Sequence, residues 1–289
     1  MSAVIAMRRP LADNLGGFVA LLRRLRVPHR VSEEGGEQVL WAGDEHQAEQ
    51  IRALYARFVE GELDVAALQA QVPAVSRPGF GQQLKASPVT AILLLLCFAV
   101  GGYSLLGERI EPLHWLTFLD FRAQGEMAYF RPWADSMAAG QVWRLITPMF
   151  IHFGILHLAM NSLWFWELGR RIEWRQGSAQ LLGLVLGFSA VSNVIQYLWS
   201  GPSLFGGLSG VLYGLLGHIW LYQWRAPAPL YYLPRGVLVM MLVWLGLCLS
   251  GLVSLLGFGE IANGAHVGGL LVGCATGLLG GTLARRKLA

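Results

Sequence analysis

Charged residues are scarce in this chain of 289 residues: they make up 14% of it, whereas hydrophobic residues make up 54%. A soluble domain is about one quarter charged, so this shortage excludes an ordinary water-soluble protein. Mean hydropathy is +0.47, which indicates a membrane protein. The formal net charge of +4 comes from arginines gathered in a few loops, so no nucleic-acid partner is needed to explain it.

Cysteine is also rare, and the three that occur, Cys97, Cys248 and Cys274, each lie inside an apolar run. A thiol there behaves as a small hydrophobic group, so neither a disulfide framework nor a metal cluster is indicated. The HExxH pattern of zinc proteases is missing. Paired aspartates are missing from the last five apolar segments, which excludes an aspartyl protease of the membrane. We expect no cofactor.

Six apolar segments follow residue 88, each close to the roughly 20 residues that a spanning helix needs. The approximate ranges are 88–107, 149–169, 179–199, 204–224, 236–257 and 262–284. The first residues have no short apolar core with a cleavage site, so we expect the first span to act as the insertion signal. The predicted fold is a polytopic α-helical membrane protein, a six-helix bundle with a small N-terminal domain.

The arginines predict the orientation, because short loops rich in Lys and Arg stay cytoplasmic. They follow the second, fourth and sixth segments: Arg170, Arg171, Arg175, Arg225, Arg235, Arg285, Arg286 and Lys287. The other loops have no such excess. Both termini are therefore predicted to be cytoplasmic.

Residues 1–70 have a different composition and predict a small α+β cytoplasmic domain. Apolar residues at helical spacing around Phe18 and again around Ile51 predict two helices, and the alternating runs 27–33 and 37–43 predict two strands. Residues 71–87 have the Pro, Gly and polar content of a linker. The membrane domain is thus predicted over 88–289.

The loop 108–144 is rich in aromatic residues spaced among charges, as is common at the headgroup level of a bilayer. These are Trp115, Phe118, Phe121, Tyr129, Phe130, Trp133 and Trp143. We expect short in-plane helices half sunk in the outer leaflet.

Ser209 and His266 are predicted at matching depths in the fourth and sixth segments, each roughly 7 Å from the segment's start at 1.5 Å per residue. Both segments run from outside to inside, so the two side chains can meet just below the outer surface. A hydrogen bond between them would let His266 accept the serine proton and activate a nucleophile. The amide of Ser209, near a helix N-terminus, is a candidate donor to an oxyanion.

Glycines favour this meeting because they let helix backbones approach closely. They follow the serine and the histidine at helical spacing: Gly210, Gly214, Gly217, Gly269, Gly273 and Gly277. Gly206 and Gly207 allow an unusual turn before Ser209.

His157 and Asn161 are four residues apart, on one helix face, and both can donate to a developing negative charge. If their helix began at Leu145, Asn161 would be roughly 24 Å deep, far below Ser209. We therefore expect the helix to begin near Phe153–Gly154.

Structural interpretations remain open for each residue taken alone. A serine in a membrane helix is most often a packing residue, His157 can bond another helix, and Trp143–Arg144 can be a simple interfacial anchor. His152, five residues from His157, forms a poor metal site with it. His218 suits a structural hydrogen bond, and Glu167 and Glu173 are expected to pair with nearby arginines.

Several motifs occur in a fixed order: Trp143-Arg144, HLAMN with His157 and Asn161, GLSG with Ser209, Tyr213, and AHVGGLLVG with His266. Together they resemble the rhomboid family of intramembrane serine proteases, and the resemblance extends to residues 1–70. It implies a Ser209–His266 dyad without a third carboxylate, an oxyanion hole of His157, Asn161 and the Ser209 amide, and Tyr213 stacked on His266.

The resemblance also implies single-pass transmembrane substrates in the bilayer of a bacterial inner membrane, cut near the outer face. Phe258 and Ile261, in the loop before the last segment, would be plugs of the substrate gate, and Pro148 stands where related chains can carry histidine. A homodimer through the cytoplasmic domain stays open. The alternatives are a catalytically silent rhomboid-like binder of transmembrane helices and a small-solute transporter, the latter disfavoured by the lack of midplane carboxylates and of an inverted repeat.

Overall fold

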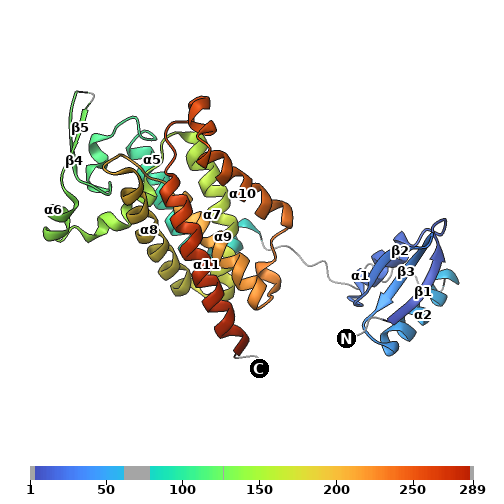
Figure 1. The fold of residues 1–289 in the computed structure, drawn as a ribbon. Coiled ribbons are helices and arrows are strands. Elements are labelled where there is room, and N and C mark those ends of the chain that lie inside the picture. Colours follow the sequence, from blue (N-terminus) through green and yellow to red (C-terminus); the bar gives the residue numbers. More distant parts are fainter. Residues whose placement is uncertain (1–3, 62–78, 126, 287–289) are drawn as a thin grey trace. The chain divides into compact units, whose positions relative to one another are not determined.

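The computed structural model describes residues 4–61, 79–125 and 127–286 (Figure 1). The chain divides into two compact units, Met1–Arg77 and Pro78–Ala289. Each unit is described by itself below.

The first unit is a three-stranded antiparallel sheet with two helices, in strand order β1-β3-β2. Its elements are β1 (Val4–Pro10), α1 (Gly16–Arg24), β2 (Arg30–Glu34), β3 (Glu37–Ala42) and α2 (Glu45–Val59). Phe18, Leu22, Leu40 and Ile51 are buried together in its core. The sequence prediction missed β1, whose short apolar stretch becomes a strand only by pairing with β3.

The second unit contains a helix for every predicted apolar segment. These are α5 (Pro88–Tyr103), α7 (Ile155–Gln176), α8 (Ser178–Ser200), α9 (Ser209–Arg225), α10 (Arg235–Leu249) and α11 (Asn263–Arg286). By length and hydropathy, α8 and α11 each suffice to cross a membrane, and α5 does so if the bent pair it forms with the preceding helix counts as one span. The number of spans, six, stays a prediction.

Glycines with positive φ set the ends of several helices. Gly154, at φ +91°, precedes α7, so the predicted start near Phe153–Gly154 is confirmed. Gly207, at φ +117°, precedes α9, which begins at Ser209 and not near 204. Ser209 is therefore the first helical residue, and the prediction of about 7 Å of helix before it was wrong. Helix α10 ends at Leu249, short of the predicted 257, and Gly251 follows with φ +77°.

The predicted linker contains a helix, α4 (Phe80–Ala86). The side chain of Gln82 accepts a hydrogen bond from the Gly79 amide at the start of this helix, and the Phe80 ring lies 5.8 Å from that of Trp166 on α7. Helix α4 meets α5 at a bend of 102°. The prediction of a linker without a helix was wrong here, because a helix this short, flanked by glycine and proline, has the composition of a loop.

The loop 108–144 and the residues that lead from it to α7 contain short helices, as predicted, and also a β-hairpin that was not predicted. Its elements are η1 (Glu111–Trp115), β4 (Phe121–Gln124), β5 (Met127–Phe130), α6 (Trp133–Ala138), η2 (Val142–Leu145) and η3 (Thr147–Phe150). Strands of four residues give too little alternation to be read from sequence. The hairpin extends away from the helices (Figure 1), while Phe118, Leu119 and Phe205 form a small apolar core beneath the loop.

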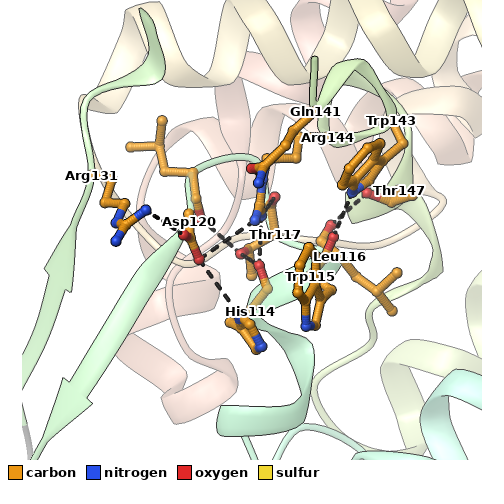
Figure 2. A network of polar contacts seen from close by, with 11 residues as sticks. His114, Trp115, Leu116, Thr117, Asp120, Arg131, Gln141, Trp143, Arg144 and Thr147 are labelled. Carbon is orange, nitrogen blue, oxygen red and sulfur yellow. Dashed lines mark hydrogen bonds and ion pairs between the residues drawn. The ribbon is translucent and has the colours of Figure 1, made fainter. Parts of the chain in front are cut away.

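Arg144 is at the centre of a network of polar contacts in the loop 108–144 (Figure 2). Its side chain is fully buried and donates to the carbonyl oxygens of His114 and Thr117, at 2.5 and 2.9 Å, and to Oε1 of Gln141 at 2.7 Å. The carboxylate of Asp120 lies 3.4 Å away. Burial lowers the pKa of this guanidinium, and the charge of Asp120 opposes that shift. Arg144 thus ties the loop together and is not a simple interfacial anchor.

Helices α9 and α11 are in backbone contact along glycine faces. A β-carbon at Gly269 would lie 2.0 Å from the carbonyl oxygen of Gly210, and one at Gly273 would lie 2.1 Å from that of Gly214. No side chain larger than glycine fits at such distances. This contact fixes the relative depth of the two helices.

The acidic residues of α7 differ in their partners. Glu167 forms ion pairs with Arg170 and Arg171, as predicted. Glu173 does not pair with an arginine among the described residues: its carboxylate accepts from the amides of Val89 and Thr90 and from two hydroxyl groups. That prediction was wrong, because the free amides at the start of α5 offer the buried carboxylate better partners.

Candidate active site

Ser209 and His266 lie within hydrogen-bond distance, with 2.7 Å between Oγ and Nε2. Ser209 begins α9, and His266 is in the first turn of α11. The glycine contacts that join these two helices therefore also set the distance between the two side chains. With Nε2 unprotonated, the imidazole accepts the serine proton, which is the arrangement needed to make a nucleophile.

His266 is in contact with an aromatic ring. Its Nδ1 is buried without a hydrogen-bond partner in the described part of the chain, so no described carboxylate completes a triad. The Tyr213 ring lies 5.0 Å from the imidazole, and the Tyr213 hydroxyl donates to the carbonyl oxygen of Met241 on α10 at 3.1 Å. The two rings are tilted by 46°, so they are in contact but are not stacked as predicted.

His157 and Asn161 project from the start of α7 toward the turn that precedes Ser209. A β-carbon at Gly207 would lie 2.7 Å from Nε2 of His157 and 3.5 Å from Nδ2 of Asn161. Nδ2 of Asn161 is buried and has no partner among the described residues. Two side-chain nitrogens therefore meet beside the turn at Gly207. The Ser209 amide, two residues further on, belongs to the first helical turn and has no acceptor within α9.

The turn before Ser209 is held by the segment that leads into α7. The amide of Gly207 donates to the carbonyl oxygen of Pro148 at 3.0 Å, and the amide of Leu208 lies 3.5 Å from Nε2 of His152. His152 is fully buried. The only signal in the sequence for this contact is a histidine within an apolar run. From the sequence, His152 was considered only as a possible metal ligand.

A small cavity opens beside Ser209, with room for about one water molecule. Its lining includes Ser189, Ser192 and Asn193 of α8 as well as Phe205 and Ala262. Gln196, also on α8, is not part of this lining: its side-chain amide accepts from the Ala265 amide and donates to Ser200. The three α8 residues were missed, although polar residues at this spacing in an apolar segment are a usable signal.

The two residues predicted as gate plugs lie just before α11. Ile261 is partly buried, and its carbonyl oxygen accepts from the Asn263 amide at 2.8 Å. Phe258 ends a π-helical turn, η5 (Ser254–Phe258), and its side chain lies outside the described residues. The side chain of Asn263 donates to the carbonyl oxygen of Cys248, and this bond joins the C-terminal end of α10 to the start of α11.

No group of three or more His, Cys, Asp or Glu side chains able to hold a metal ion occurs within 4–61, 79–125 and 127–286. His218, in particular, lies 2.9 Å from Nε2 of Gln176 and 3.1 Å from the hydroxyl of Thr276. It links α7, α9 and α11 and fits the structural hydrogen bond expected of it.

Comparison with known families agrees with this architecture. The family model of the rhomboid domain matches residues 139–282, and that of the rhomboid N-terminal domain matches residues 1–69. Rhomboids are polytopic helical membrane proteins that are generally serine intramembrane proteases, although inactive members exist. The chain belongs to the rhomboid family.

Proposed function

We propose that this protein is an intramembrane serine endopeptidase that cleaves the transmembrane helices of single-pass proteins near the outer face of the membrane. The observation that carries the proposal is the 2.7 Å contact between Oγ of Ser209 and Nε2 of His266. In this account Ser209 is the nucleophile and His266 the general base. The order of the motifs further favours a protein of the bacterial GlpG type.

Acylation starts when Oγ of Ser209 attacks the scissile carbonyl carbon while His266 takes the serine proton. The tetrahedral intermediate carries a negative oxygen. His157, Asn161 and the amide of Ser209 are the donors that would stabilise it. The unpartnered Nδ2 of Asn161 supports this, because a buried donor without an acceptor costs free energy unless function uses it. Protonated His266 then gives its proton to the leaving amine.

Deacylation needs water in an apolar surrounding. The cavity beside Ser209, with Ser189, Ser192 and Asn193 in its lining, supports a supply of water next to the acyl-enzyme, because its hydroxyl and amide groups can bond it. His266 would activate that water as it activated the serine. No metal ion or organic cofactor takes part in these steps.

Substrates would reach Ser209 laterally, between α7 and α10. Helix α10 is short, and Val239, Met240, Val243 and Trp244 on it are exposed apolar side chains, which suits a helix that faces lipid. Ile261 and Phe258 would act as plugs of this gate. We further propose a bacterial inner-membrane location with both termini cytoplasmic, and a homodimer through the N-terminal unit remains a hypothesis.

The test is cleavage of a single-pass substrate in proteoliposomes, with the products mapped by mass spectrometry. We expect one cut near the outer end of the substrate helix by the parent and none by Ser209→Ala or His266→Ala. If both variants cut at the parental position and rate, the proposal is wrong.

The second candidate is a catalytically silent binder of transmembrane helices, since the family includes inactive members. A folded parent that retains the substrate helix but neither cuts it nor reacts with a serine-directed probe would favour that function.

A further inference from the structure

His152 is a buried histidine to which the proposed mechanism gives no role. It lies three residues before Ile155, where α7 begins, and its side chain is fully buried. Its ring centroid is 5.0 Å from that of His157. The ring therefore lies between the segment leading into α7 and the turn that leads into α9.

The contacts of the ring define its protonation. Nδ1 lies 3.2 Å from the carbonyl oxygen of Phe150. A carbonyl oxygen only accepts, so Nδ1 carries the hydrogen, and in the neutral ring Nε2 is then an acceptor. The amide of Leu208 is 3.5 Å from this Nε2 and can donate to it.

Three contacts fasten the turn before Ser209 to the same segment. The Gly207 amide donates to the carbonyl oxygen of Pro148, and Gly206 packs so closely that a β-carbon there would lie 2.7 Å from Ile151. His152 supplies the last contact, at the residue adjacent to the nucleophile. It is the only one of the three made by a polar side chain.

We propose that His152 is a positioning residue for the oxyanion site. It holds the Leu208 peptide on one side and packs against His157 on the other, so it sets the distance between the backbone donor of Ser209 and the side-chain donor of His157. It touches neither the substrate nor the dyad. The inference deepens the proposed function and rests on it.

A positioning role has a specific kinetic consequence. If the donors around the oxyanion move by a fraction of an ångström, the transition state is stabilised less while a bound ligand is held as before. The first-order rate of reaction at saturation falls, and the half-saturating concentration does not change.

The test uses the full chain in mild detergent and a fluorescent fluorophosphonate, with the labelling rate of Ser209 measured over a range of probe concentrations. Glutamine keeps an acceptor near the position of Nε2, methionine has similar length without one, and asparagine is one methylene too short. We expect His152→Met and His152→Asn to label about tenfold more slowly at saturation, less than the roughly 10²-fold loss of an oxyanion donor itself. We expect His152→Gln to stay within about threefold of the parent.

His218→Met is the control for loss of a buried histidine away from Ser209, and it should label at the parental rate even if its melting temperature falls. If His152→Met does not fold, the glutamine and asparagine variants decide. Parental rates in every His152 variant, equal slowing in the glutamine and asparagine variants, or a change confined to the half-saturating concentration would each overturn the inference. A parent that does not label at all would instead count against the proposed function.

Discussion

At the scale of single residues, the site is a set of polar atoms that the fold leaves available beside one serine. The amide of Ser209 is free because α9 starts there, and Nδ2 of Asn161 has no partner among the described residues. Each is expensive to bury alone. A role in stabilising the oxyanion explains why both donors lie near the turn at Gly207.

Asn161→Ala is expected to slow fluorophosphonate labelling of Ser209 by about tenfold to hundredfold, because one donor to the oxyanion is lost. Melting should change little, since that donor has no partner in the described structure to lose. The neighbouring Ser162→Ala on α7 serves as the control. An Asn161→Ala protein that labels and cleaves at the parental rate would remove Asn161 from the oxyanion site.

Sequence reasoning at this scale found the residues whose chemistry is unusual in a membrane. Ser209, His266, His157 and Asn161 were predicted to come together, and the structure brings them together, while their catalytic roles stay predictions. His152 was missed because its role depends on the Leu208 amide, 56 residues along the chain. A contact with a backbone amide cannot be predicted from the pattern of side chains in the sequence.

At the scale of elements, the contact between α9 and α11 determines the geometry of the site. The carbonyl oxygens of Gly210 and Gly214 lie where β-carbons at Gly269 and Gly273 would have to be. These glycines were predicted to form a close contact from their four-residue spacing.

Gly269→Ala is expected to destabilise the membrane unit by about 3 kcal/mol or more, because the new methyl group meets backbone that cannot move aside. It should also abolish labelling by separating Ser209 from His266. The matched control is Gly183→Ala on α8, where a β-carbon meets no atom within 4 Å. Thermal unfolding in detergent measures both variants, and equal stability of the two would contradict the close contact.

Glu173 joins the C-terminal part of α7 to the start of α5. We expect Glu173→Ala to lower stability by about 3 kcal/mol, since it leaves the buried amides of Val89 and Thr90 without acceptors, whereas Thr90→Val loses one hydrogen bond and about 1 kcal/mol. Thermal unfolding checks the order of the two effects. If Thr90→Val cost more than Glu173→Ala, the carboxylate would not be the main partner of α5.

Strands that lack a clear alternating pattern escaped prediction. Strand β1 is defined by its pairing with the distant β3, and the strands of the hairpin β4–β5 have only four residues each. The six apolar helices were found because their length is a local property, but the starts of α7 and α9 depend on the conformation of Gly154 and Gly207. The start of α7 was predicted correctly because Asn161 has to lie at the depth of Ser209. The start of α9 was predicted five residues too early.

At the scale of the whole molecule, every residue of the proposed site belongs to the unit Pro78–Ala289. The unit Met1–Arg77 has its own sheet and its own apolar core. It is also predicted to lie on the other side of the membrane from the dyad.

Deleting residues 1–75 should therefore leave cleavage of a single-pass substrate detectable, because Ser209, His266 and the proposed oxyanion donors all belong to the other unit. Cleavage in proteoliposomes and thermal unfolding of the truncated protein are the two measurements. Complete loss of cleavage by a truncated protein that still folds would show that the N-terminal unit takes part in catalysis.

The most direct measurement for the account as a whole is the mass of the protein and of its proteolytic peptides after reaction with a fluorophosphonate in mild detergent. The account predicts one adduct, on Ser209, formed by the parent and absent in Ser209→Ala and His266→Ala variants that remain folded. A folded parent without an adduct, or an adduct on another residue that persists in both variants, would contradict the proposed Ser209–His266 dyad.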